Sequence, residues 1–113
     1  MNKKHILCIE DETEMIELIR MVLEREGFEV TGAMGGEQGL KMMKELKPDL
    51  ILLDLMMPGM DGWEVYKQMR ADKELTDIPV IIVTAKARSI DRVLGLQVAK
   101  VADYITKPLA PKS

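Results

Sequence analysis

Three acidic residues stand directly after apolar runs in this sequence. Glu10 and Asp11 follow residues 6–9, and Asp54 follows residues 50–53. Brought together, these three carboxylates repel one another unless a cation lies among them. Mg²⁺ suits such a place, because it takes oxygen ligands and commonly binds one or two carboxylates beside a phosphate oxygen. The acidic residues therefore indicate a site for a hard divalent cation.

Two further reactive groups follow other apolar runs. Thr84 comes after residues 80–83 and offers a hydroxyl, with the backbone N–H of Ala85 next to it. Lys107 comes after residues 104–106 and offers an ammonium. Such a set suits in-line phosphoryl transfer, in which positioning and charge neutralisation do most of the work. Asp54 is the candidate nucleophile, because an aspartate can hold a phosphoryl group as an acyl phosphate.

Strand-like and helix-like segments must position these residues, and the two kinds alternate along the chain. We expect strands at residues 5–9, 28–31, 50–53, 80–83 and 104–106. We expect helices at residues 12–26, 36–46, 62–71 and 89–99. This alternation is typical of a parallel sheet with crossover helices.

The composition of the strands predicts their order. The first, third and fourth are continuously apolar, as expected when helices cover both faces, whereas the second alternates and the fifth is short. With right-handed crossovers, this predicts a doubly wound five-stranded α/β sheet of the flavodoxin-like order 2-1-3-4-5. Its switch point lies between the first and third strands, where Glu10, Asp11 and Asp54 would meet.

Length and charge limit the classes of function. The 113 residues suit one domain, and the net charge of −3 gives no basic surface for direct nucleic-acid binding by this segment. We find no apolar stretch of membrane-spanning length and no signal-peptide pattern. The single cysteine, Cys8, lies in an apolar run and is expected in the core. The sequence therefore predicts a cytoplasmic domain that binds no membrane.

Four motifs make the chain similar to receiver domains of bacterial two-component response regulators. They are Ile9-Glu10-Asp11-Glu12, Asp54 with Met57-Pro58-Gly59-Met60-Asp61-Gly62, Val83-Thr84-Ala85, and Tyr104-Ile105-Thr106-Lys107-Pro108. The resemblance implies that Asp54 accepts a phosphoryl group from a histidine kinase or phosphotransfer protein. It also implies a switch that assists its own phosphorylation and dephosphorylation and acts on a target protein or output domain.

The same resemblance implies a role for each site residue. Mg²⁺ is expected to bind Asp11, Asp54 and the backbone carbonyl of Met56, with Glu10 acting through water. Thr84, Ala85 and Lys107 are expected to contact the phosphoryl group. Tyr104 is expected to move in concert with Thr84, and Lys107-Pro108 to be a cis peptide.

The chain departs from the receiver pattern in several places. Glu10 stands where many receivers have Asp, and Lys100-Val101-Ala102 replaces Gly-Ala-Asp. Leu109 follows where an aromatic residue is common, and Met56 and Lys86 occupy positions that influence phosphate lifetime in the family. Residues 109–113 cannot form the fifth helix of a receiver. We therefore expect a domain truncated at its C-terminus, or a homodimer or partner that covers the exposed face.

Other interpretations remain open at this stage. A pseudo-receiver would bind partners without using phosphate. An aspartate-nucleophile phosphohydrolase usually has an acid–base aspartate two residues after the nucleophile, where this chain has Met56. Asp54 alone resembles a helix-start cap, and the acids at 10–12 would favour the positive end of a helix.

The glycines between residues 32 and 39 and the single histidine are not expected to belong to the site. The four glycines Gly32, Gly35, Gly36 and Gly39 match no phosphate-binding motif, so a flexible loop that enters the helix at 36–46 is expected there. His5 precedes the first strand and is expected to be exposed.

Overall fold

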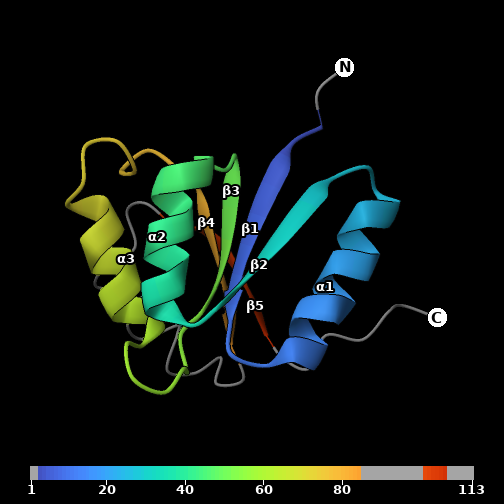
Figure 1. Cartoon of the computed structure of the whole chain (residues 1–113), viewed down its shortest axis with the longest axis horizontal. Helices are drawn as coiled ribbons and strands as arrows, with labels where there is room; N and C mark the ends of the chain where they lie inside the picture. Colours follow the sequence, from blue (N-terminus) through green and yellow to red (C-terminus); the bar gives the residue numbers. More distant parts are fainter. Residues whose placement is uncertain (1–2, 85–100, 107–113) are drawn as a thin grey trace.

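The computed structural model describes residues 3–84 and 101–106. Within them, five strands form one parallel sheet in the order β2-β1-β3-β4-β5 (Figure 1). The strands are β1 (His5–Glu10), β2 (Glu29–Met34), β3 (Leu50–Asp54), β4 (Val80–Thr84) and β5 (Val101–Thr106). The predicted strand order is confirmed. The helix expected at 89–99 and the chain from 107 to 113 lie outside the described residues.

In the described part of the chain, three helices cover the two faces of the sheet. They are α1 (Thr13–Arg25), α2 (Gly36–Leu46) and α3 (Gly62–Arg70). Figure 1 shows α1 on one face and α2 with α3 on the other. Among the described residues, no helix combines the length and apolar character that a membrane span needs.

The sheet separates two clusters of buried side chains. In β1, Leu7 and Ile9 pack in the cluster beneath α2 and α3, whereas Ile6 and Cys8 pack in the cluster beneath α1. Successive strand residues point to opposite faces, so both sets must be apolar when both faces are covered. The buried position of Cys8 confirms the expected core role.

Two strands extend three residues beyond their predicted bounds, whereas β1, β3 and β4 end one residue later than predicted. β2 pairs with β1 as far as Glu10 and Met34, past the expected end at Thr31. β5 begins at Val101, within the Lys100-Val101-Ala102 segment that departs from the receiver motif. Its register with β4 shifts between Val80 and Ile81, so an extra β5 residue is accommodated there. Pairing with a neighbouring strand extends both elements beyond their apolar residues.

The helix predicted at 36–46 is confirmed with those bounds, whereas the flexible loop expected before it is reduced to Gly35, because β2 continues to Met34. Gly32 lies in β2, whereas Gly36 and Gly39 lie in α2. A Cβ atom on Gly39 would come 2.6 Å from Cδ1 of Ile9, and one on Gly36 would come 2.8 Å from Cγ2 of Val65. These glycines allow α2 to approach the sheet and α3 closely.

The expectation that His5 is exposed is wrong. The side chain is half-buried, and its Nε2 lies 2.7 Å from Oγ1 of Thr31. Its backbone N–H donates to Oδ2 of Asp49 at 2.8 Å. These bonds join the first residue of β1 to β2 and to the turn before β3, at the amino edge of the sheet.

Candidate phosphoacceptor and metal site

Two buried carboxylates lie on adjacent strands at the carboxyl edge of the sheet. Ile9 of β1 pairs with Leu53 of β3, and Glu10 and Asp54 are the next residues on these strands. Each acid lies two residues after a side chain that packs beneath α1, namely Cys8 and Leu52. Because side chains alternate along a strand, Glu10 and Asp54 lie on that same face of the sheet. Glu10 is 1% exposed and Asp54 is 3% exposed, and no other charged side chain between residues 3 and 83 is buried.

The turn after β3 holds Asp54 through the backbone. The N–H of Met56 donates to Oδ1 of Asp54 at 3.0 Å. The cap of α3 is a different residue, because Oδ1 of Asp61 accepts from the N–H of Glu64 at 2.9 Å. The interpretation of Asp54 as only a helix cap is therefore wrong.

Gly62 fits this turn because it lacks a side chain. Its N–H donates to the carbonyl of Leu55 at 3.2 Å. A Cβ atom there would come 2.6 Å from Cα of Leu55 and would also meet the carbonyl oxygen of Asp54. Gly62 thus lets the backbone after Asp54 turn closely against the start of α3, a role that the sequence analysis did not assign to it. The sequence signal for this role was the pair Asp61-Gly62 shortly after a buried strand.

The turn after β1 gathers three carboxylates at the start of α1. Oε2 of Glu10 accepts from the N–H groups of Asp11 at 3.1 Å and Glu12 at 3.3 Å. Oxygen atoms of Glu10, Asp11 and Glu12 all lie within 4.8 Å of one another. The three acids directly precede the first residue of α1, so their negative charges lie near the positive end of its helix dipole. A favourable interaction with that dipole is compatible with metal binding.

The donors at this edge fit a hard divalent cation. Carboxylate and backbone carbonyl oxygens are the ligands that Mg²⁺ prefers, and the turns after β1 and β3 present both kinds. The group of three acids includes Glu12, which the sequence placed in a motif but not among the metal residues. Met56 follows Asp54 in the other turn, and its side chain is 54% exposed.

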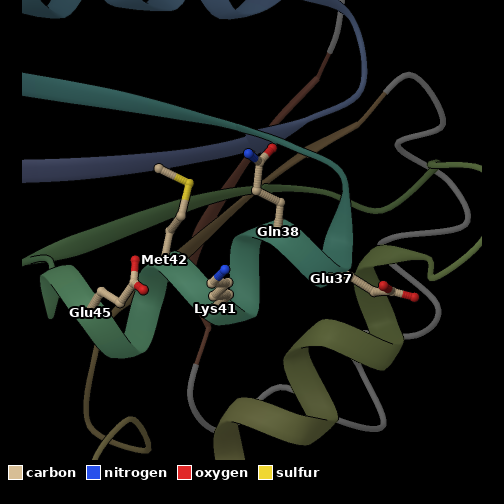
Figure 2. A pocket seen from close by; sticks show the side chains of 5 residues that line it. All are labelled: Glu37, Gln38, Lys41, Met42 and Glu45. Carbon is tan, nitrogen blue, oxygen red and sulfur yellow. The ribbon is translucent and has the colours of Figure 1, made fainter.

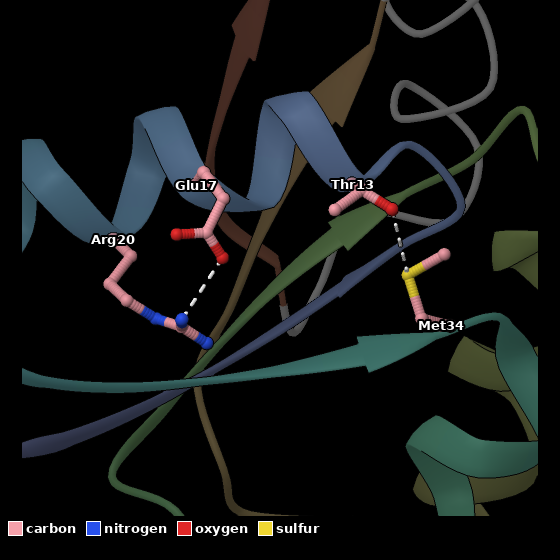
Figure 3. A network of polar contacts seen from close by, with 4 residues as sticks. All are labelled: Thr13, Glu17, Arg20 and Met34. Carbon is pink, nitrogen blue, oxygen red and sulfur yellow. Dashed lines mark hydrogen bonds and ion pairs between the residues drawn. The ribbon is translucent and has the colours of Figure 1, made fainter.

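A contact beside the acids joins α1 to β2. Oγ1 of Thr13, the first residue of α1, donates to Sδ of Met34, the last residue of β2, at 3.9 Å (Figure 3). Met34 also pairs with Glu10 in the sheet. Figure 3 shows a second contact farther along α1, an exposed pair of Glu17 and Arg20 with 3.0 Å between Oε2 and Nη1. The contact of Thr13 with Met34 links the acidic turn to the edge strand.

The backbone places two more predicted residues at this edge. Asp54 pairs with Val83, and Thr84 is the next residue of β4. Thr84 pairs with Thr106, the last residue of β5, and Tyr104 pairs with Ile82. The predicted contacts of Ala85 and Lys107, and the residues Lys86, Pro108 and Leu109, lie outside the described residues.

Surface hollows elsewhere on the described part of the chain bring together no comparable set of groups. The one in Figure 2 is lined by five side chains that all project from α2, namely Glu37, Gln38, Lys41, Met42 and Glu45. Another lies along the start of α3 beside Trp63. Both mix acidic and basic side chains, so the carboxyl edge of the sheet remains the candidate site.

Comparison with known families gives a match over nearly the whole chain. The family model described as response regulator receiver domain matches residues 6–113. PhoP of Bacillus subtilis, an alkaline phosphatase synthesis transcriptional regulatory protein, is 46% identical over 112 residues, covering 99% of this chain and 45% of PhoP. The DNA-binding response regulator MtrA of Mycobacterium tuberculosis strain H37Rv is 42% identical, covering 97% of this chain and 46% of MtrA. The chain spans about half the length of these relatives.

Solved structures agree with the fold. The N-terminal domain of a response regulator receiver protein from Methanoculleus marisnigri has a TM-score of 0.83 at 36% identity, covering 92% of this chain and 84% of that one. The response regulator TrrA from Thermotoga maritima, solved in complex with Mg²⁺ and BeF, has a TM-score of 0.81 at 33% identity. That match covers 94% of this chain and 88% of TrrA.

Proposed function

The chain belongs to the response regulator receiver family, the phosphoacceptor modules of two-component signalling, and we propose that Asp54 is its phosphoacceptor. The observation that supports this choice is the burial of Asp54 beside Glu10 at the carboxyl ends of β3 and β1. In open α/β sheets of this kind, ligands bind beyond the strand ends at the switch point.

The proposed reaction transfers a phosphoryl group from a phosphohistidine of the donor protein to Asp54. A carboxylate oxygen of Asp54 attacks phosphorus, the new P–O bond gives an acyl phosphate, and the P–N bond of a donor phosphohistidine breaks. The hydrogen bond from the N–H of Met56 holds the carboxylate in place before the attack. A positioned nucleophile removes much of the entropic cost of bringing the reactants together.

We assign Mg²⁺ to the acids at the same edge, held by Asp11, Asp54 and the carbonyl of Met56, with Glu10 acting through water. Mg²⁺ would supply positive charge to offset the phosphoryl oxygens and the carboxylates. Thr84, Ala85 and Lys107 complete the proposal as contacts of the phosphoryl group, and Tyr104 as the residue that moves with Thr84. The Mg²⁺ in the TrrA complex, a related receiver, supports this assignment.

The proposed partners follow from the relatives. A histidine kinase or phosphotransfer protein would supply the phosphoryl group in the cytoplasm. Because PhoP and MtrA are named as a transcriptional regulator and a DNA-binding regulator and are about twice as long, the signal would pass to a DNA-binding output region or a target protein. In this proposal, phosphorylation biases the switch between two arrangements, as other phosphate switches do. We infer that the domain acts as a switch and not as a phosphohydrolase, because Met56 stands where such enzymes usually have an acid–base aspartate.

Intact mass after incubation with acetyl phosphate and Mg²⁺ tests the proposal. The expected result is a gain of one phosphoryl group in the wild type and none in Asp54→Asn or without metal. Asp49→Asn is a matched control, because Asp49 is an exposed carboxylate just before the other end of β3. This variant should be phosphorylated like the wild type.

The alternatives give different results. A folded wild-type protein that gains no mass with any phosphodonor would favour a pseudo-receiver that binds partners without phosphate. Equal phosphorylation of Asp54→Asn would place the phosphoacceptor at another carboxylate. Continuous release of phosphate from a stable monoester substrate would support the phosphohydrolase interpretation instead.

A further inference from the structure

Met34 combines an exposed thioether with a hydroxyl donor beside its sulfur. It is the last residue of β2 and is 49% exposed. Figure 3 shows its sulfur facing the hydroxyl of Thr13 at the start of α1, with 3.9 Å between Sδ and Oγ1. The backbone fixes where this side chain begins, because the N–H of Met34 donates to Oε1 of Gln38 at 2.7 Å and the residue pairs with Glu10 of β1. The sulfur is therefore held near α1 and remains open to small reagents in solution.

The present contact is weak because a thioether sulfur is a poor hydrogen-bond acceptor. Oxidation of the sulfur changes that chemistry. A hydroperoxide gives one oxygen atom to the sulfur: a sulfur lone pair forms the S–O bond, the O–O bond breaks, and hydrogen peroxide leaves as water. The sulfur loses two electrons, and the peroxide gains the same two. The product is a sulfoxide, whose polar oxygen accepts hydrogen bonds far better than the thioether did.

The geometry between Met34 and Thr13 has room for this oxygen. An oxygen on the α1 side of the sulfur would lie within the 3.9 Å that now separates Sδ from Oγ1, and O–H···O bonds need only about 2.7–2.8 Å. The unbranched methionine side chain can rotate to adjust that distance. Because both residues are exposed, the sulfoxide dipole stays in contact with water and does not enter the core.

We propose that Met34 is an oxidation-sensitive modification site, where hydroperoxides form a sulfoxide that accepts a hydrogen bond from Thr13 and fastens the start of α1 to the end of β2. The modification is reversible, because methionine sulfoxide reductases restore the thioether. Met34 and Thr13 are not among the residues assigned to the metal or the phosphoryl group, so the inference holds whether or not Asp54 is phosphorylated.

Peptide mass mapping after treatment with hydrogen peroxide tests the first half of the proposal. Met43 and Met69 are fully buried, whereas Met21 on α1 is 46% exposed, close to the exposure of Met34. Because oxidation follows exposure, Met34 should react about as fast as Met21 and more than about tenfold faster than Met43 and Met69. Oxidation of Met34 as slow as that of the two buried methionines would overturn the proposal.

Hydrogen exchange at the start of α1 tests the second half. The N–H groups of Met15 and Ile16 donate to the carbonyl of Glu12, so their exchange reports how often the first turn opens. The measurement uses a Met21→Leu/Met56→Leu background, which leaves Met34 as the exposed methionine of the described residues. Oxidation should slow this exchange about fivefold, the effect of one additional neutral hydrogen bond. Reductase treatment should restore the original rate.

Substitutions at the two partners separate the proposed hydrogen bond from other effects of peroxide. Thr13→Val keeps the shape of the side chain without its hydroxyl, so oxidation should then change the exchange less than about twofold. Thr13→Ser keeps the donor and should keep the full effect. Met34→Leu in the same background shows the contribution of every other methionine, which should be negligible.

The same comparison shows which results contradict the proposal. Equal slowing in Thr13→Val and in the parent protein would mean that the sulfoxide acts without the Thr13 hydroxyl, and the proposal would be overturned. Faster or unchanged exchange in the oxidised parent protein would overturn it as well. None of these results depends on phosphorylation, so the proposed function of Asp54 is tested separately.

Discussion

Glu10 and Asp54 are buried neighbours on adjacent parallel strands, each one residue beyond the paired Ile9 and Leu53. Both lie on the α1 face of the sheet, and each accepts backbone hydrogen bonds from the turn that follows it. An ionised side chain is costly to bury, so both positions are unusual for carboxylates that serve only the fold. Their burial is the feature that the proposed phosphoacceptor site explains.

Removing one of the two charges should stabilise the metal-free protein. We expect Asp54→Asn to raise the free energy of unfolding by about 0.5–2 kcal/mol, because the amide keeps an acceptor for the N–H of Met56 and relieves repulsion. Urea unfolding with EDTA measures this change. Mg²⁺ should then stabilise the wild type but not the variant. A variant less stable than the wild type in EDTA would contradict the prediction.

A methyl group at Gly62 should disturb the phosphoacceptor turn. Gly62→Ala is expected to lose about 1–3 kcal/mol from overpacking, because the new Cβ meets the backbone of Asp54 and Leu55. Phosphorylation by acetyl phosphate should also slow. Gly27→Ala is the control, because its positive φ of 92° makes Ala costly while no atom lies within 4 Å of the new Cβ. That variant should lose stability but keep the phosphorylation rate, and an equal slowing in both would contradict the steric account.

Arg70 should stabilise the segment between α3 and β4 through specific geometry. Its Nη1 donates to the carbonyls of Thr76 and Ile78, and its guanidinium lies 4.9 Å from the ring centroid of Tyr66. Arg70→Lys should cost about 1–3 kcal/mol, because a lysine cannot reproduce these donors together with the ring contact. Lys67→Ala, which removes only an exposed ion pair with Glu64, should cost less than about 1 kcal/mol. Urea unfolding followed by Trp63 fluorescence compares them, and equal losses would argue against a role for the geometry.

Truncation of two neighbouring methionines should destabilise the fold to very different degrees. Met57 is 6% exposed in the cluster beneath α2 and α3, so Met57→Ala should cost about 2–5 kcal/mol. Met56 is 54% exposed, and Met56→Ala should change the free energy of unfolding by less than about 0.5 kcal/mol. Thermal and urea unfolding of both variants test this difference. A large loss in Met56→Ala would mean that its side chain packs more tightly than its exposure indicates.

The sheet order could be predicted because a parallel strand that is buried on both faces has apolar residues at successive positions. The runs that became β1, β3 and β4 are apolar at every position, and that pattern placed them in the centre. Glu10 and Asp54 could be predicted for the same reason, because a charge that ends such a run must lie at the edge of the sheet. Their closeness then followed from the order.

Other features depend on contacts that the sequence does not reveal. The reason why α2 contains Gly36 and Gly39 is one such contact, because the helix packs closely against Val65 and Ile9 there. His5 gains a partner, Thr31, only through the pairing of β1 with β2. The closeness of Glu12 to the other acids depends on the backbone of one turn, which a motif alone does not specify.

The alternation of side chains along β3 also limits how this protein can change over evolutionary time. Substitutions in the turn after Asp54 alter the surroundings of the carboxylate but leave the strand pairing intact. A one-residue insertion or deletion within β3 would instead exchange the two faces, turning the carboxylate into the apolar layer and a leucine toward the acids. Lineages descended from this sequence should therefore accumulate point changes around the site but almost no length changes in this strand. The same constraint applies to anyone who transfers the site to another sheet.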